Sequence, residues 1–247
     1  LAAEDTRSMR KLLNIHNIPL KDRPILSYND FNGDRVRPTI LNWLNSNMAV
    51  AYASDAGMPL IADPGYQLSK QAAEAGFYVT AVPGASACIT ALSLSGLPTD
   101  RFFFEGFLPV SKEKRRQKLK ELSSIPSTLI FYESPKRLIK MFEDLIAIMG
   151  ENRRAVIARE LTKKFEQIIS GTLGELHALL LKKPLKGELV VLLDRPLTTG
   201  LEDLDVKAEL RIALSEMTLK DASDFVASAH GLSKRYVYNL ALSMREY

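Results

Sequence analysis

Four apolar segments of this sequence are each followed by small or charged residues that could bind a ligand. The apolar segments are Ala49–Ala53, Tyr78–Val82, Thr128–Tyr132 and Ala155–Ala158. The residues that follow them are Ser54–Pro59 and Asp63–Gly65, Pro83–Ala87, Glu133–Pro135, and Arg159–Lys163. Glycine in such a segment lets a ligand approach the backbone closely, because it has no β-carbon. Ligands of parallel α/β sheets bind beyond the carboxyl ends of the strands, so we expect one binding site where the four apolar segments end.

Each of these segments also has an interpretation without a ligand. Asp55–Gly57 could be an ordinary strand-to-helix turn, and Pro83–Ser86 a tight turn that ends in a helix N-cap. Glu133 could cap a helix or form an ion pair at its start, and Arg159–Glu160 could pair internally or with neighbours. The sequence contains neither G-x-G-x-x-G nor G-x-x-x-x-G-K-[ST]. A classical dehydrogenase and a nucleoside triphosphatase are therefore disfavoured.

A basic run extends from Lys112 to Lys120 and contains one acidic residue, Glu113. Such a run can be the solvated face of a helix, but it can also follow a phosphodiester backbone, especially where other cations lie at strand-to-helix junctions. We predict that the phosphates of such a backbone are bound by Arg7, Arg101, Lys112, Lys114, Arg115, Arg116, Lys136, Arg137 and Lys163.

The composition narrows the class of protein. The 247 residues include 33 basic and 29 acidic side chains, a formal charge of +4 that mildly favours a polyanionic partner. A hydrophobic content of 46% is typical of globular proteins and excludes disordered and fibrous classes. No apolar run approaches the roughly 18 residues of a membrane span, so we expect no membrane partner. The one cysteine, Cys88, fits a reducing cytoplasm, and the three scattered histidines predict no metal site.

Strands must alternate with helices to position these segments, which predicts an α/β fold with parallel or mixed sheets flanked by helices. We place a domain boundary near Asp100, giving an N-terminal α/β domain over 1–100 and a second α/β domain over 101–197. Residues 198–247 carry no strand pattern and have helix–turn–helix spacing, which also suits a plain helical hairpin. Within the second domain, Ser134-Pro135 predicts a helix start, and Thr172 with Glu175 predicts a capping box.

Seven motifs, in order along the chain, resemble those of the tetrapyrrole methylase superfamily, and within it the ribosomal RNA small subunit methyltransferase I branch. They are Ala3–Arg7, Ser54–Gly65, Pro83–Ala87, Leu97–Phe102, Glu105–Pro109, Phe131–Pro135 and Ala158–Lys163. The resemblance covers residues 1 to about 195, and the helical tail is similar to the C-terminal extension of that branch.

This resemblance implies an S-adenosylmethionine-dependent enzyme that methylates a cytidine ribose 2′-oxygen in 16S rRNA of the small ribosomal subunit. It further implies two α/β domains with the cofactor in the cleft between them, and a homodimer. The branch opens with a strand and a cofactor loop that this chain, which starts at Leu1, does not contain. We therefore expect that strand and loop upstream of Leu1.

By the same resemblance, the cofactor is expected to contact two loops of the first domain and the cleft edge of the second. The residues are Asp55, Ala56, Gly57, Pro83, Gly84, Ser86, Ala87, Tyr132, Glu133 and Leu161. Arg159 and Glu160 fall on the same cleft edge.

A carboxylate could accept the proton of the ribose hydroxyl. The candidates are Glu160, Glu133, Glu4 and Asp5, and we prefer Glu160 because Arg159 and Lys163 beside it could orient an RNA phosphate. Two alternative functions stay open. One is a tetrapyrrole C-methyltransferase of the same fold, and the other is a non-catalytic RNA-binding or ribosome-assembly protein.

Overall fold

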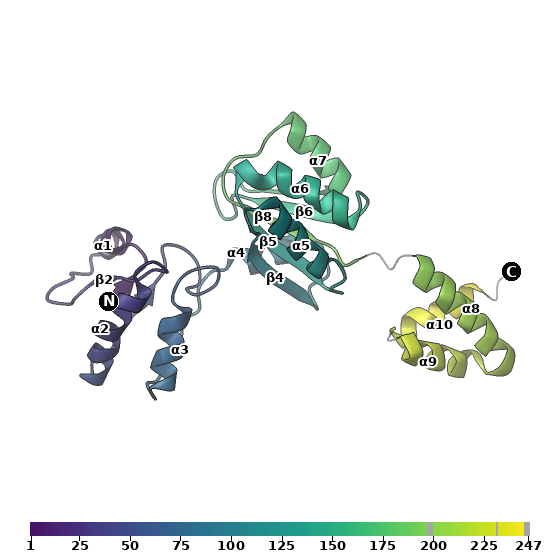
Figure 1. Ribbon diagram of the computed structural model, residues 1–247, viewed down its shortest axis with the longest axis horizontal. Helices are drawn as coiled ribbons and strands as arrows, with labels where there is room; N and C mark the ends of the chain where they lie inside the picture. The colour runs from purple at the N-terminus through teal and green to yellow at the C-terminus, as the bar shows by residue number, and fades with distance from the viewer. Residues whose placement is uncertain (197–199, 231, 245–247) are drawn as a thin grey trace. The chain divides into compact units, whose positions relative to one another are not determined.

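The computed structural model describes residues 1–196, 200–230 and 232–244. These residues contain two sheets and their flanking helices, followed by a group of three helices (Figure 1). The strands are β1 (Ala2–Ala3), β2 (Leu26–Ser27), β3 (Tyr52–Ala53), β4 (Phe102–Phe107), β5 (Thr128–Glu133), β6 (Arg154–Arg159), β7 (Gln167–Thr172) and β8 (Leu189–Leu193). The helices are α1 (Thr6–Ile15), α2 (Gly33–Asn45), α3 (Tyr66–Glu74), α4 (Ala87–Ser95), α5 (Lys112–Ser123), α6 (Pro135–Met149), α7 (Leu173–Lys182), α8 (Gly200–Glu216), α9 (Leu219–His230) and α10 (Lys234–Ser243).

The first sheet is parallel and has the order β2-β1-β3. Its middle strand is β1 (Ala2–Ala3). Because β2 and β3 both run parallel to β1, the carboxyl ends of all three strands lie at one edge of the sheet. Buried Tyr28 and Ile40 pack beneath it. The helix that follows β1 is capped by Asp5, whose carboxylate accepts a hydrogen bond from the Arg7 backbone N–H at 2.8 Å.

Tyr78–Val82, which the sequence predicts as a strand, is not one in the structure. Tyr78 and Val82 are 90% and 85% exposed. A strand needs a neighbour to receive its backbone hydrogen bonds, and no strand of the described first sheet pairs with this segment. The apolar pattern is present, but the pairing that would make it a strand is not.

The second sheet is mixed and has the order β4-β5-β8-β6-β7. β4 and β5 are parallel, whereas β8 runs antiparallel to both β5 and β6, and β7 runs antiparallel to β6. The capping box of Thr172 and Glu175 is confirmed at the start of α7, and Ser134-Pro135 begins α6 as predicted.

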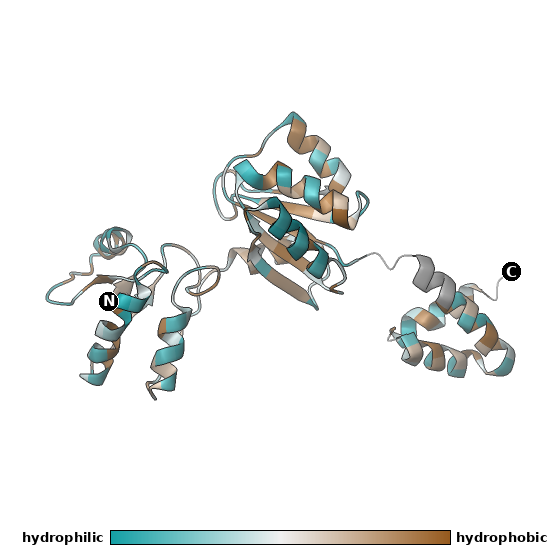
Figure 2. Cartoon of the chain, in the orientation of Figure 1, coloured by the Kyte–Doolittle hydropathy of each residue, from teal (hydrophilic) through white to brown (hydrophobic). Residues whose placement is uncertain are grey.

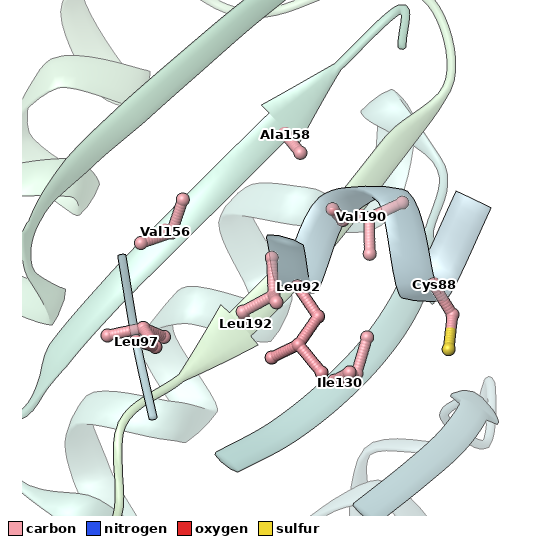
Figure 3. Close-up of a cluster of buried hydrophobic side chains, with 9 residues drawn as sticks. Cys88, Leu92, Leu97, Ile130, Val156, Ala158, Val190 and Leu192 are labelled. Atoms are coloured by element: carbon pink, nitrogen blue, oxygen red, sulfur yellow. The ribbon is translucent and has the colours of Figure 1, made fainter. Parts of the chain in front are cut away.

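Helix α4 packs on the second sheet although it precedes residue 100 in the chain. Its Cys88, Ala91 and Leu92 side chains, with Leu97, contact residues of β5, β6 and β8 (Figure 3). The strand residues of this cluster are Ile130, Val156, Ala158, Val190 and Leu192. Residues 1–123 and 127–194 form one compact unit, within which the division at residue 100 stays a prediction.

The opposite face of the second sheet is covered by α5, α6 and α7. Leu129 and Phe131 alternate with Ile130 along β5 and therefore face away from α4. Both are fully buried, as are Met141 and Phe142 of α6. Helix α5 is hydrophilic along most of its length, whereas the strands beneath are hydrophobic (Figure 2).

Helices α8, α9 and α10 form a second unit with its own core. Val206 and Leu210 of α8 pack with Val226 of α9 and Val237 of α10, all at 1% exposure or less. The predicted helical character of the tail is confirmed for the described residues. The predicted domain boundary at residues 197–198 and the turn glycine Gly231 lie outside them.

Candidate active site

An open pocket of about 230 Å³ lies where the loop after β3, the start of α4 and the ends of β4 and β5 meet. Five residues predicted from the sequence to contact the cofactor line it together: Ala56, Gly57, Ser86, Ala87 and Tyr132. The other lining residues are Met58, Ile61, Ala62, Asp63 and Phe107, none of which was predicted as a site residue. All of them except Phe107 belong to the segment Ser54–Gly65, which the sequence singles out.

The loop that forms one wall of the pocket is held in unusual backbone conformations. Gly57, Leu60 and Ala62 have φ of +75°, +71° and +60°. Left-handed conformations are costly for residues with a β-carbon and persist only where the surroundings impose them. Here the Tyr52 hydroxyl donates a hydrogen bond to the Pro64 carbonyl at 2.7 Å. Tyr52 thus anchors the end of the loop to β3 and fixes the shape of the wall.

Tyr132 forms the opposite wall. Its ring makes edge-to-face contacts with Phe104 and Phe107, at centroid distances of 4.9 and 5.7 Å. Its hydroxyl accepts a hydrogen bond from the Cys88 backbone N–H at 3.1 Å, which ties the end of β5 to the first turn of α4. Burial raises the pKa of Tyr132, so the phenol is neutral near pH 7.

The remaining predicted cofactor residues lie around this pocket rather than in its lining. Asp55 lines a neighbouring hollow beside α1, together with Asp5. Pro83 and Gly84 precede Ser86 in the same loop, and a β-carbon on Gly84 would lie 3.5 Å from the Met58 sulfur. Leu161 packs against the cluster beneath α4.

Asp63 is the carboxylate in the pocket lining, and it is partly buried. Burial raises its pKa, and the nearby Glu4 carboxylate raises it further, with smaller contributions from Asp55 and Asp30. The Ser54 side chain acts in the opposite direction and lowers the pKa of Asp63. The sequence places Asp63 after β3, but only the fold shows that it reaches the pocket.

Glu160, the preferred base, does not line the pocket. Its Oε1 accepts a 2.7 Å hydrogen bond from the Glu188 backbone N–H and lies 3.4 Å from the Lys163 ammonium. The Glu188 N–H is the main cause of a lowered pKa at Glu160, with Lys163 adding to it. Glu160 also packs so closely on Gly187 that a β-carbon there would displace the Glu160 side chain. These contacts make Glu160 a residue that holds the turn before β8, and its placement does not support a role as base.

Glu133 and Arg137 form an ion pair, and Arg137 also binds the loop after β4. Glu133 Oε1 accepts the Ser134 N–H at 2.7 Å, and its Oε2 lies 3.2 Å from the Arg137 guanidinium. Arg137 also donates to the Leu108 carbonyl at 2.5 Å. Burial raises the pKa of Glu133, although the Ser134 N–H and Arg137 act to lower it. The capping and ion-pairing interpretation of Glu133 is therefore the one that its geometry matches.

Arg115 and Arg116 both bind Asp144, which is buried on α6. Arg115 donates from Nε to Oδ2 at 2.8 Å, and Arg116 donates from Nε to Oδ1 at 2.6 Å. The Arg115 side chain is 7% exposed and that of Arg116 is 42% exposed. The two arginines lower the pKa of Asp144 even though its burial acts to raise it. Arg115 is thus a packing residue between α5 and α6, and its placement argues against the predicted phosphate contact.

The other predicted RNA-binding cations differ in their surroundings. Arg101, Lys112, Lys114 and Lys136 are exposed. Lys163 lies 3.0 Å from the Glu188 carboxylate in addition to its contact with Glu160.

The two N-terminal carboxylates named as possible bases are engaged outside the pocket lining. Asp5 pairs with Arg7 at 2.6 Å, and the hydrogen bonds from Arg7 lower the Asp5 pKa to about 2. Glu4 accepts the Asp55 backbone N–H at 3.2 Å.

The described part of the chain has neither a membrane-spanning helix nor a cluster of metal-binding side chains. None of its helices combines the length and apolar character needed to cross a membrane. Within the same residues, no group of three or more His, Cys, Asp or Glu side chains is placed to hold a metal ion.

Comparison with known proteins places these features in a family. Residues 8–177 match the family model described as tetrapyrrole (corrin/porphyrin) methylases, and residues 201–245 match the RsmI C-terminal HTH domain. The ribosomal RNA small subunit methyltransferase I of Escherichia coli O157:H7 is 42% identical over 99% of this chain and 86% of that protein. The protein of the same name from Halalkalibacterium halodurans is 41% identical over 97% of this chain and 84% of the relative.

The fold has a match among solved structures as well. The crystal structure of diphthine synthase superposes with a TM-score of 0.56 at 17% identity, covering 78% of each chain. At that identity the similarity concerns the fold alone. By the family model and by its full-length relatives, the chain belongs to the tetrapyrrole methylase family and, within it, to the ribosomal RNA small subunit methyltransferase I group.

Proposed function

We propose that this protein transfers the methyl group of S-adenosylmethionine to the ribose 2′-oxygen of a cytidine in 16S rRNA of the small ribosomal subunit. The observation that carries the proposal is the pocket, in which residues of four separate motifs of the group lie together. The identity of about 40% to proteins named for small subunit rRNA methylation, over nearly the whole chain, supports the substrate class.

The pocket suits the cofactor chemically. Ala56, Gly57 and Ala87 give one side small residues that leave the backbone open to a ligand, while Tyr132 and Phe107 offer aromatic surface on the other. A carboxylate in the lining complements the positive charge of a sulfonium. When bound, S-adenosylmethionine supplies a methyl group that is already activated. The residues of the chain therefore have to orient the ribose oxygen in line with it and exclude water.

We propose that the exposed cations hold the RNA backbone. Lys112 and Lys114 project from the first turn of α5, and Arg101 and Lys136 lie at the starts of β4 and α6. Lysines and arginines in such positions bind phosphates without reading sequence. Arg115 is left out of this set because it is buried against Asp144.

The two alternative functions are less well supported. A tetrapyrrole C-methyltransferase shares the family model, but the full-length relatives at about 40% identity are named for rRNA methylation. A non-catalytic assembly protein would not need the pocket. We further propose a cytoplasmic homodimer, and a division into domains at 1–100, 101–197 and 198–247.

The test is the transfer of tritium from labelled S-adenosylmethionine to small ribosomal subunits, naked 16S rRNA and a uroporphyrin-type acid in parallel. Label in the subunit or rRNA, mapped to a 2′-O-methylcytidine, is the expected result. Label in the porphyrin would favour the C-methyltransferase. Cofactor binding without transfer to any of the three would refute the proposed reaction, and no binding by calorimetry would favour the assembly protein.

A further inference from the structure

We infer that Asp63 is the catalytic carboxylate, which accepts the proton of the ribose hydroxyl during methyl transfer. This inference rests on the proposed function and assigns its proton acceptor. The candidates considered from the sequence were Glu160, Glu133, Glu4 and Asp5. None of these four lines the pocket, whereas Asp63 does.

The contacts of the other carboxylates explain why they are poor acceptors. Asp5 is paired with Arg7, Glu133 with Arg137, and Glu160 with Lys163 and a backbone N–H. A carboxylate that is already hydrogen-bonded to a cation gains little by taking up a proton. Glu4 accepts the Asp55 N–H and adds negative charge beside Asp63.

The surroundings of Asp63 make its carboxylate more basic. It is partly buried at the pocket wall, and the negative charges of Glu4, Asp55 and Asp30 act on it. Both burial and like charge favour the protonated form, so the pKa of Asp63 is raised. A general base is most effective when its pKa approaches the working pH. The Ser54 side chain acts in the opposite direction and moderates the rise in the Asp63 pKa.

The loop geometry fixes the position of this carboxylate. Asp63 follows Ala62, which has a left-handed backbone, and precedes Pro64, whose carbonyl is held by the Tyr52 hydroxyl at 2.7 Å. The aromatic rings of Tyr132 and Phe107 line the same pocket. A ribose that enters between them would meet the carboxylate and an apolar surface at once.

The step balances without a further reactant. The ribose oxygen forms a bond to the methyl carbon, and the sulfur–carbon bond breaks with its electron pair remaining on sulfur. The hydroxyl O–H bond breaks and the proton passes to Asp63. The sulfonium charge and the carboxylate charge are thereby both neutralised, and the protonated Asp63 then releases its proton to solvent.

The test compares Asp63→Asn with wild type in single-turnover methylation of small subunits at saturating S-adenosylmethionine. We expect the rate to fall about 10²- to 10⁴-fold, the usual contribution of a general base. Calorimetric affinity for S-adenosylhomocysteine is expected to change by less than about threefold, on the order of what a retained pocket allows. Asp63→Glu should recover part of the rate. Asp22→Asn, which changes an exposed aspartate outside the site, is the matched control.

The pH profile and the stability distinguish a base from a structural residue. The wild-type rate should fall as the pH drops through the Asp63 pKa, and Asp63→Asn should lack that limb. Because ionisation of Asp63 is disfavoured in the fold, the Asn variant should be at least as heat-stable as wild type at neutral pH. A rate within about threefold of wild type, a lost S-adenosylhomocysteine affinity, or a lowered melting temperature with no rescue by Glu would overturn the assignment. If wild type itself transfers no methyl group to RNA, the proposed function fails, and the assignment fails with it.

Discussion

Removing the carboxylate of Asp144 should destabilise the α/β unit strongly, because it would leave the Arg115 guanidinium buried without its partner. Breaking a buried ion pair by deleting one side costs about 3–5 kcal/mol. Arg115 keeps one acceptor in the variant, the Val110 carbonyl at 3.1 Å, so we expect Asp144→Ala to lie near the lower end, about 3 kcal/mol. Arg116 is 42% exposed and adds at most about 1 kcal/mol.

The assay is equilibrium urea unfolding followed by circular dichroism and by the emission of Trp43. With a urea dependence of roughly 3 kcal/mol per molar, a loss of about 3 kcal/mol lowers the midpoint by about 1 M. Asp34→Ala is the matched control, since that aspartate also pairs with an arginine, at 3.0 Å, but is fully exposed. We expect its effect to stay within about 0.5 kcal/mol.

The pH dependence of the same experiment follows from the lowered pKa of Asp144. The stabilisation is complete above the unfolded-state pKa and disappears as the pH falls through the folded-state value, so the two proteins should converge in acid. A loss of less than about 1 kcal/mol at pH 7 would refute the reasoning. So would a reduced salt dependence of RNA binding in Arg115→Met, because that would make Arg115 a phosphate contact after all.

Three further predictions concern two exposed lysines, a buried leucine and a glutamate that is hydrogen-bonded within a turn. Replacing both Lys112 and Lys114 by alanine should lower the slope of log affinity for RNA against log salt concentration by about 2, measured by filter binding. The control Lys182→Ala should leave this slope unchanged. Equal slopes for the double variant and wild type would contradict the proposed phosphate contacts of Lys112 and Lys114. Leu92→Ala should lower the free energy of unfolding by about 2–5 kcal/mol, because the side chain is 4% exposed between α4 and the second sheet; a loss below about 1 kcal/mol in urea would mean that α4 is not anchored there. Glu160→Gln should keep the single-turnover rate within about threefold, since its carboxylate holds a turn, and a loss of 100-fold or more would restore it as the base.

Several local features followed from sequence pattern because neighbouring residues decide them. The capping box at Thr172 depends on a hydrogen bond between residues three apart, and Ser134-Pro135 begins α6 for a similarly local reason. The α/β alternation was confirmed for the same reason, except at Tyr78–Val82. A strand at Tyr78–Val82 would require another strand to pair with, and a local sequence pattern does not determine whether one lies beside it.

The candidate site also has features that sequence motifs predict and features that depend on the fold. Motif types and their order along the chain determined the family, and four of these motifs supply residues that line the candidate pocket. Which carboxylate faces that pocket depends on the path of the loop through left-handed residues and on the anchor from Tyr52.

The sequence by itself therefore determined the class of fold, the family and the segments whose residues line the candidate pocket. Only the tertiary structure decided the roles of individual charged side chains. Arg115 in the basic run is buried against Asp144, and Glu160 holds a turn, while Asp63 reaches the pocket. The physical reason is that a charged group acts through its burial and its partners. In this chain those partners lie 28 residues away for Glu160 and 29 for Arg115.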